Sequence, residues 1–253
     1  MKKYSVIAFL LAFTWGLLPL SAQEGEPELK SFVLSDTTFL YREHSTACGW
    51  HRIYIEHNRK NDNYEALEEY SISGYRKDGY DRQIEDIKEG YPNRLKKFAL
   101  GDLPRDWLPL RLFEGKYYIY APSEWTYADH RVITDVAFVE QMMDGPWPSA
   151  LKSFKKTGDR YDIEYYTYAD GVRSLAIHMI DTVNKIAVWE YKNNEGEPVG
   201  YELRVASSNV RLFPLVVNDW GCRALFEVVF DRPDCKAILA GTQKPVFICK
   251  NKE

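Results

Sequence analysis

A carboxylate and an imidazole stand side by side at Asp129 and His130, just after two aromatic residues, Trp125 and Tyr127. A carboxylate next to an imidazole can take up and release protons, and indole and phenol rings offer a flat apolar surface with a polar edge. Neighbouring residues of a strand point to opposite faces, so Asp129 and His130 share a site only if their segment is a loop. We predict a ligand-binding loop here. An ordinary polar surface loop is the simpler interpretation of the same residues.

Trp147 is a second candidate for contact with a ligand. It stands between Pro146 and Pro148, which predicts a rigid loop that presents the indole ring. The chain is also rich in aromatic residues, with 18 Tyr, 12 Phe and 7 Trp, and the predicted strand over 116–120 carries tyrosines on both of its faces. We therefore predict that Trp147 and some of the tyrosines line an aromatic cleft. Cross-strand aromatic pairs on a solvated sheet face explain the same residues equally well.

The familiar catalytic motifs are missing from the sequence. It contains no Gly-x-Ser-x-Gly, no His-Glu-x-x-His, no glycine-rich phosphate loop and no dinucleotide-binding fingerprint. The histidines lack the spacing of a metal site, because His51 and His57 would lie roughly 20 Å apart along one strand. We expect no catalytic residues, no metal and no cofactor. A hydrolase that uses two carboxylates positioned by the fold needs none of these motifs and stays open as an alternative.

The charge of the chain argues against a nucleic-acid partner. Asp and Glu number 37 and Lys and Arg number 33, which gives a formal net charge of −4. Binding to nucleic acid without sequence preference requires an excess of positive charge. The partner is therefore expected to be a small-molecule ligand or another protein of the cell envelope.

The first 22 residues have the pattern of an export signal. Lys2 and Lys3 precede an apolar run over 6–18, and Ala22 is a small residue suited to the position before a cleavage site. The run is shorter than the roughly 20 residues that a spanning helix needs. We predict that 1–22 is removed, that 23–30 is a flexible lead-in, and that 31–253 folds as a single β-rich domain. The mature chain is expected to be soluble and periplasmic or extracellular, without a membrane span.

Four cysteines follow the predicted signal: Cys48, Cys222, Cys235 and Cys249. An even number of cysteines in an exported chain favours disulfides. A local bridge between Cys222 and Cys235 closes a short loop, and it leaves Cys48 to pair with Cys249. The other two pairings and buried free thiols remain alternatives.

The second half of the chain has the period of two that is typical of half-buried strands. Short runs rich in Tyr, Val, Ile and Leu over 161–168, 173–180, 185–191 and 199–205 are separated by turn residues. They predict an antiparallel meander. Two further hairpin turns are predicted at Glu114-Gly115 and at Gly158-Asp159, since glycine readily adopts the positive φ that tight hairpin turns require.

About a dozen short strands are expected in all, including one over 131–140. Helix is scarce, with one short helix expected over 80–89 and a second possible over 93–99. We predict a mainly β fold in which the meander closes into a lipocalin-like barrel, because closure removes the exposed edges of the sheet. A two-sheet β-sandwich is the alternative.

These observations together favour an exported, non-catalytic binding protein. Its aromatic-lined cleft is expected to take a sugar, a lipid or a peptide. A structural or protein-interaction module of the cell envelope is the main alternative, and the carboxylate-pair hydrolase is the second.

Overall fold

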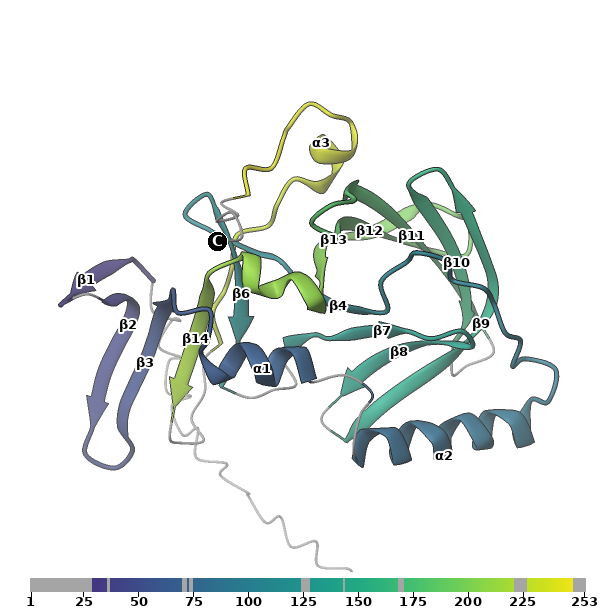
Figure 1. Ribbon diagram of the computed structural model, residues 1–253, viewed down its shortest axis with the longest axis horizontal. Coiled ribbons are helices and arrows are strands. Elements are labelled where there is room, and N and C mark those ends of the chain that lie inside the picture. Colours follow the sequence, from purple (N-terminus) through teal and green to yellow (C-terminus); the bar gives the residue numbers. More distant parts are fainter. Residues whose placement is uncertain are drawn as a thin grey trace, which may run out of the picture.

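The computed structural model describes residues 29–35, 37–69, 72, 75–123, 128–142, 144–167, 171–220 and 227–247. The strands form two structures, a closed barrel of eight strands and a six-stranded open sheet. Figure 1 shows them side by side, with the C-terminal segment crossing above both. The predicted mainly β fold with an antiparallel barrel is confirmed.

The barrel is a meander that one upstream strand closes into a ring. The seven consecutive strands are β7 (Arg131–Ile133), β8 (Ala137–Met142), β9 (Gly145–Thr157), β10 (Arg160–Tyr166), β11 (Val172–Asp181), β12 (Ile186–Lys192) and β13 (Pro198–Ala206). Each pairs antiparallel with the next, and β4 (Asp106–Pro109) joins β13 to β7. The predicted strand over 131–140 is therefore a hairpin. Thr134 turns the chain between β7 and β8, because its Oγ1 accepts a hydrogen bond from the N–H of Ala137 and its own N–H donates to the Ala137 carbonyl.

The open sheet gathers strands from distant parts of the chain. In spatial order it holds β1 (Phe32–Leu34), β2 (Thr37–Ser45), β3 (Gly49–Glu56), β14 (Leu215–Trp220), β6 (Lys116–Ala121) and β5 (Arg111–Phe113). Only the pairing of β14 with β6 is parallel. A single residue, Leu110, separates β4 of the barrel from β5 of the sheet, so one stretch of chain serves both structures.

Both predicted hairpin turns are present. Glu114 and Gly115 have φ values of 47° and 73°, and Gly158 has a φ of 60°. The first turn joins β5 to β6 and the second joins β9 to β10. Positive φ at consecutive central residues gives a turn whose twist matches that of paired strands.

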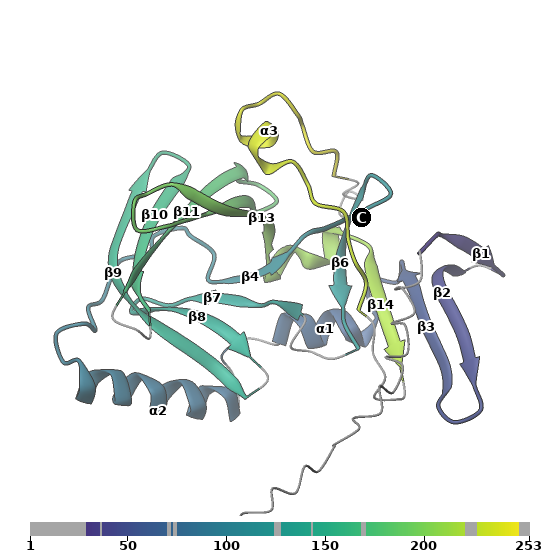
Figure 2. The same cartoon turned by 180° about the vertical axis from the view of Figure 1, so that it is seen from behind.

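Helices occupy the periphery of the strands. They are α1 (Asp62–Glu69), α2 (Tyr75–Gly90), the 3-10 helix η2 (Ser207–Leu212) and α3 (Cys235–Leu239). The helix predicted over 80–89 lies inside α2, which Figure 2 shows running along the barrel beside β9. The helix predicted over 93–99 is wrong, because the backbone N–H of Phe98 donates to Asp135 in the β7–β8 turn instead of to its own segment.

The barrel interior is a packed aromatic core. The rings of Trp107 and Trp189 lie 5.6 Å apart between centroids, and those of Phe138 and Tyr165 lie 4.6 Å apart. All four side chains are buried. Such rings contribute large buried area and specific edge and stacking contacts, so they fill the space that a lipocalin uses for its ligand.

A second core lies between the outer wall of the barrel and the open sheet. Leu108 and Leu203 from the barrel pack with Ile119 and Leu215 from the sheet, and all four are buried. The two structures therefore share apolar surface that neither covers alone.

Cys235 is a buried free thiol at the start of α3. Burial raises its pKa to about 11. The predicted local bridge between Cys222 and Cys235 is therefore wrong, because α3 turns Cys235 into the shared core. Cys222 and Cys249 lie outside the described residues, so the pairing of the remaining cysteines stays a prediction.

The predicted signal over 1–22 and most of the predicted lead-in also lie outside the described residues. Export, and a single domain over 31–253, therefore stay predictions. Among the helices that the structure describes, none is long and apolar enough to cross a membrane.

Candidate functional site

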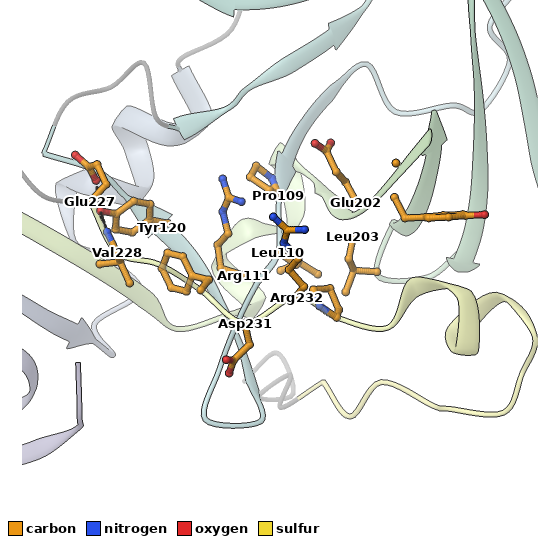
Figure 3. A pocket seen from close by; sticks show the side chains of 14 residues that line it. Pro109, Leu110, Arg111, Tyr120, Glu202, Leu203, Glu227, Val228, Asp231 and Arg232 are labelled. Atoms are coloured by element: carbon orange, nitrogen blue, oxygen red, sulfur yellow. Dashed lines mark hydrogen bonds between the residues drawn. The ribbon is translucent and has the colours of Figure 1, made fainter. Parts of the chain in front are cut away.

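A pocket of about 530 Å³ lies where the barrel, the open sheet and the C-terminal segment meet. Figure 3 shows the side chains around it. One wall comes from β13, a second from the passage between β4 and β5, and a third from the C-terminal segment over 227–233. The lining residues are Pro109, Leu110, Arg111, Tyr120, Gly200, Tyr201, Glu202, Leu203, Glu227, Val228, Phe230, Asp231, Arg232 and Pro233.

The C-terminal segment is fixed to the open sheet by backbone pairing. Leu112 and Asp231 form an antiparallel bridge, in which the N–H of Asp231 donates to the carbonyl of Leu112 over 2.9 Å. Phe230 packs edge-on against Tyr120 with 5.1 Å between ring centroids. These contacts hold the third wall of the pocket in place.

Glu227 accepts hydrogen bonds from three neutral groups at one end of the pocket. The donors are the Tyr120 hydroxyl, Ser123 Oγ at 2.7 Å and Asn218 Nδ2 at 3.3 Å. Asn218 continues the chain of polar contacts to buried His51, whose Nε2 lies 2.8 Å from Asn218 Oδ1. Burial and the hydrogen bond to Glu227 raise the pKa of Tyr120, so its phenol stays a donor at neutral pH.

Glu202 belongs to an ionic network at the opposite wall. Arg204, which is 0% exposed, donates from Nε to Glu202 Oε2 at 2.8 Å and from Nη2 to Asp129 Oδ2 at 2.7 Å. The Tyr191 hydroxyl also donates to Glu202, and Arg131 lies 2.7 Å from Asp129. Burial alone would raise the pKa of Asp129, but the nearby guanidinium groups of Arg204 and Arg131 outweigh it and lower the pKa.

Arg111 differs from Arg204 in having no such partners. Its side chain lines the pocket and is largely buried, and within the described residues it has neither a hydrogen bond nor an ion pair with another side chain. Its guanidinium carbon lies 6.0 Å from the centroid of the Phe230 ring. Burial lowers the pKa of Arg111, and the negative charges of Asp129 and Glu202, which act on it without direct contact, do not fully offset this effect.

Of the residues predicted to form a site, the three that the structure describes do not line the pocket. Trp125 and Tyr127 lie outside the described residues. Asp129 and His130 lie in a loop, as the shared-site hypothesis required, but they face different partners. Asp129 is held by Arg204, whereas His130 is fully buried with Nε2 at 3.8 Å from Asp106. Neither residue lines the pocket.

Trp147 lies on strand β9 and not in the predicted loop. It stands opposite Glu140 of β8, its side chain is 44% exposed, and its indole N–H donates to Asp144. It is not among the residues that line the pocket. Its predicted role in a common aromatic cleft with the loop before Asp129 therefore has no support in the described geometry.

The tyrosines of β6, which lie on both faces of the strand, are all buried. Tyr117, Tyr118 and Tyr120 are only 6%, 4% and 5% exposed. Strand β6 lies inside the open sheet with a hydrophobic cluster on each face, so both sets of side chains are covered. Tyr120 nevertheless contributes its hydroxyl to the pocket wall.

Within the described residues, no group of three or more His, Cys, Asp or Glu side chains is placed to hold a metal ion. Comparison of the chain with protein-family models, with curated proteins and with solved structures gave no match. The pocket and its side chains are therefore the basis for any functional proposal.

Proposed function

We propose that the protein is an exported, non-catalytic binding protein that holds a small ligand in the pocket between β13, β5 and the C-terminal segment. The observation that carries the proposal is the pocket itself. Its volume of about 530 Å³ falls within the range of about 300 to 1,000 Å³ that is common for small-molecule sites. The barrel supports the site from outside, since its own interior is occupied by aromatic side chains.

The walls of the pocket combine flat apolar surface with fixed polar groups. Tyr120, Tyr201 and Phe230 supply rings, while Glu202 and Glu227 supply carboxylates that are already oriented by other residues. Preorganised polar groups beside aromatic surface favour a sugar or a short peptide over a lipid chain, because a lipid chain would leave the buried charges without partners.

Retention of a ligand tests the proposal directly. Protein purified from cells that express the full chain is analysed by native mass spectrometry for bound small molecules, and any ligand found is then titrated. We expect Tyr201→Ala and Phe230→Ala to weaken binding by about tenfold or more, because each removes a ring from the wall. Trp147→Ala is the matched control and should leave binding unchanged, since it removes an exposed ring outside the pocket.

Loss of binding has to be separated from loss of folding. Each variant is therefore compared with wild type by thermal unfolding, and binding is measured only well below the transition. Equal binding by wild type and both ring variants, or equal weakening by Trp147→Ala, would contradict a ligand site in this pocket.

One observation favours the alternative function of an envelope interaction module. Edge strand β1 exposes three apolar side chains in a row, with Phe32, Val33 and Leu34 at 44%, 70% and 43% exposure. An apolar sheet edge can pair with a strand of another protein. A stable protein complex that Val33→Lys abolishes, while ligand retention is unaffected, would support this second function.

A further inference from the structure

Arg111 and Arg232 lie directly opposite each other at the pocket. The bridge between Leu112 and Asp231 is antiparallel, so the residue before Leu112 stands opposite the residue after Asp231. Opposite residues of an antiparallel pair place their side chains on the same face. Figure 3 shows both guanidinium groups on the pocket side, whereas the Asp231 carboxylate points the other way.

This arrangement brings two positive charges together, and no described carboxylate forms a direct ion pair with either of them; Asp129 and Glu202 act on Arg111 only from a distance. Like Arg111, Arg232 has no ion pair or side-chain hydrogen bond within the part of the chain that the structure describes. Like charges directly opposite each other on paired strands are destabilising, and a guanidinium removed from water requires compensation.

The nearby carboxylates are already engaged by other residues. Glu202 is bound by Arg204 and Tyr191, and Glu227 takes its hydrogen bonds from Tyr120, Ser123 and Asn218. The guanidinium groups of Arg111 and Arg232 are thus available to bind a group that is not part of the described chain.

We propose that the pocket binds its ligand through a carboxylate held between Arg111 and Arg232. The proposal rests on the proposed function and names the chemical class of the ligand. Guanidinium groups match the planar carboxylate with paired N–H donors. A carboxylate carries one negative charge and suits this pocket better than a phosphate with two, because Glu202 and Glu227 keep a negative potential on the other walls.

The test uses pairs of probes that differ in charge but not in shape. Benzoate is compared with benzamide and glucuronate with glucuronamide, all at constant ionic strength, with inorganic phosphate as a separate arm. Binding is followed through the Nε–H NMR signals of the arginine side chains in the full mature protein. The Arg111 signal is identified by its absence in Arg111→Lys.

We expect an acid to shift the Arg111 signal and its neutral amide to leave that signal in place. Arg232→Gln should weaken binding of the acid by about tenfold, since a hydrogen bond to a charged group is worth about 1.5 to 3 kcal/mol. Arg232 is exposed, so this variant keeps its fold even if the buried Arg111→Gln does not. Arg82→Gln on exposed α2 removes the same charge elsewhere and should bind the acid as wild type does.

The outcomes separate this inference from the proposed function. If acid and amide perturb pocket residues equally, the pocket is a ligand site and the carboxylate proposal is wrong. If phosphate binds the two arginines more tightly than either acid, the carboxylate assignment is also overturned. If none of the probes shifts Arg111 at millimolar concentration and no ligand co-purifies, both proposals fail.

Discussion

The barrel and the open sheet share one stretch of chain, yet they differ in whether internal carboxylates bind their arginine side chains. In the barrel every strand has two neighbours, and the fully buried Arg204 is satisfied by Asp129 and Glu202. In the open sheet β5 lies at an edge, and its first residue, Arg111, has no comparable partner within the described residues. The two guanidinium groups, one fully buried and one partly buried, therefore differ in how far internal partners compensate their charge.

The difference indicates which region supports structure and which supports binding. A buried charge whose partners are all internal contributes to a fixed arrangement, and removing one partner leaves the others uncompensated. A buried charge without an internal partner is tolerated where a ligand supplies the missing group. In the proposed function, the closed barrel acts as the support and the edge of the open sheet provides the site.

Removal of Arg204 should produce the largest effect on stability. Arg204→Met leaves the partly buried Asp129 and Glu202 without their main counter-charge, and we expect a loss of about 3 kcal/mol in the free energy of unfolding. Urea denaturation followed by circular dichroism measures it. The control is Arg211→Met, which removes a partly exposed pair with Glu68 and should cost about 1 kcal/mol or less.

The free energy of unfolding at low pH provides a second measurement of the same network. Because the pKa of Asp129 is lowered in the folded state, its contribution is present above its unfolded pKa near about 3.9 and is lost as the pH falls through the folded value. Asp129→Asn should remove this contribution. A wild-type stability that does not fall below about pH 4 relative to Asp129→Asn would show that the network does not hold Asp129 ionised.

Removal of a disulfide in the open sheet should have the next largest effect on stability. Cys48 at the β2–β3 turn is disulfide-bonded, and Cys235 is free, so the partner is Cys222 or Cys249. The register of β3 with β14 ends at His51 opposite Trp220, two residues before Cys222 in sequence. We therefore predict a bond between Cys48 and Cys222.

The position of Phe247 argues against Cys249. Phe247 packs against Phe213, which precedes β14, and two residues reach at most about 7 Å. The six residues of β14 extend over roughly 17 Å toward the Cys48 turn. Peptide mapping without reduction identifies the pair, and Cys222→Ser should lower stability by about 2 to 4 kcal/mol. A peptide that joins Cys48 to Cys249 would refute the assignment.

The barrel was predictable from sequence because its signals are local. The alternation over 161–205 and the Gly158 turn each act within about ten residues, and consecutive strands then pair with their neighbours. Arg204 alternates with Leu203 and Val205 in the sequence, a pattern typical of a side chain that faces solvent. Both faces of β13 are buried here, one inside the barrel and one against the open sheet.

The candidate site was not predictable from the same signals. Arg111, Glu202 and Glu227 lie on three separate segments of the chain, and only tertiary pairing brings them to one pocket. Trp147 was misplaced for a different reason. Its flanking prolines occupy β9 beyond the end of its pairing with β10 at Leu151, where the missing N–H groups break no ladder.

Replacing one turn glycine in each region should have the smallest effect on stability. It also compares the two regions most directly. Gly115 in the open sheet and Gly158 in the barrel both have positive φ, and a Cβ added at either meets no atom within 4 Å. Replacement by alanine should therefore cost only the backbone strain, about 1 kcal/mol at each position. Because the two regions share the core around Leu108 and Ile119, we expect both variants to lower the global free energy of unfolding equally.

Hydrogen exchange of backbone amides distinguishes shared from separate unfolding. If the regions unfold together, Gly115→Ala accelerates exchange of the slowest amides in β10 and β11 as much as in β6. If acceleration is confined to β6 and β14, the open sheet opens while the barrel stays closed. The pocket would then open with the sheet, because its third wall is fixed to β5 through the bridge at Leu112, and a bound ligand would slow exchange in the sheet more than in the barrel.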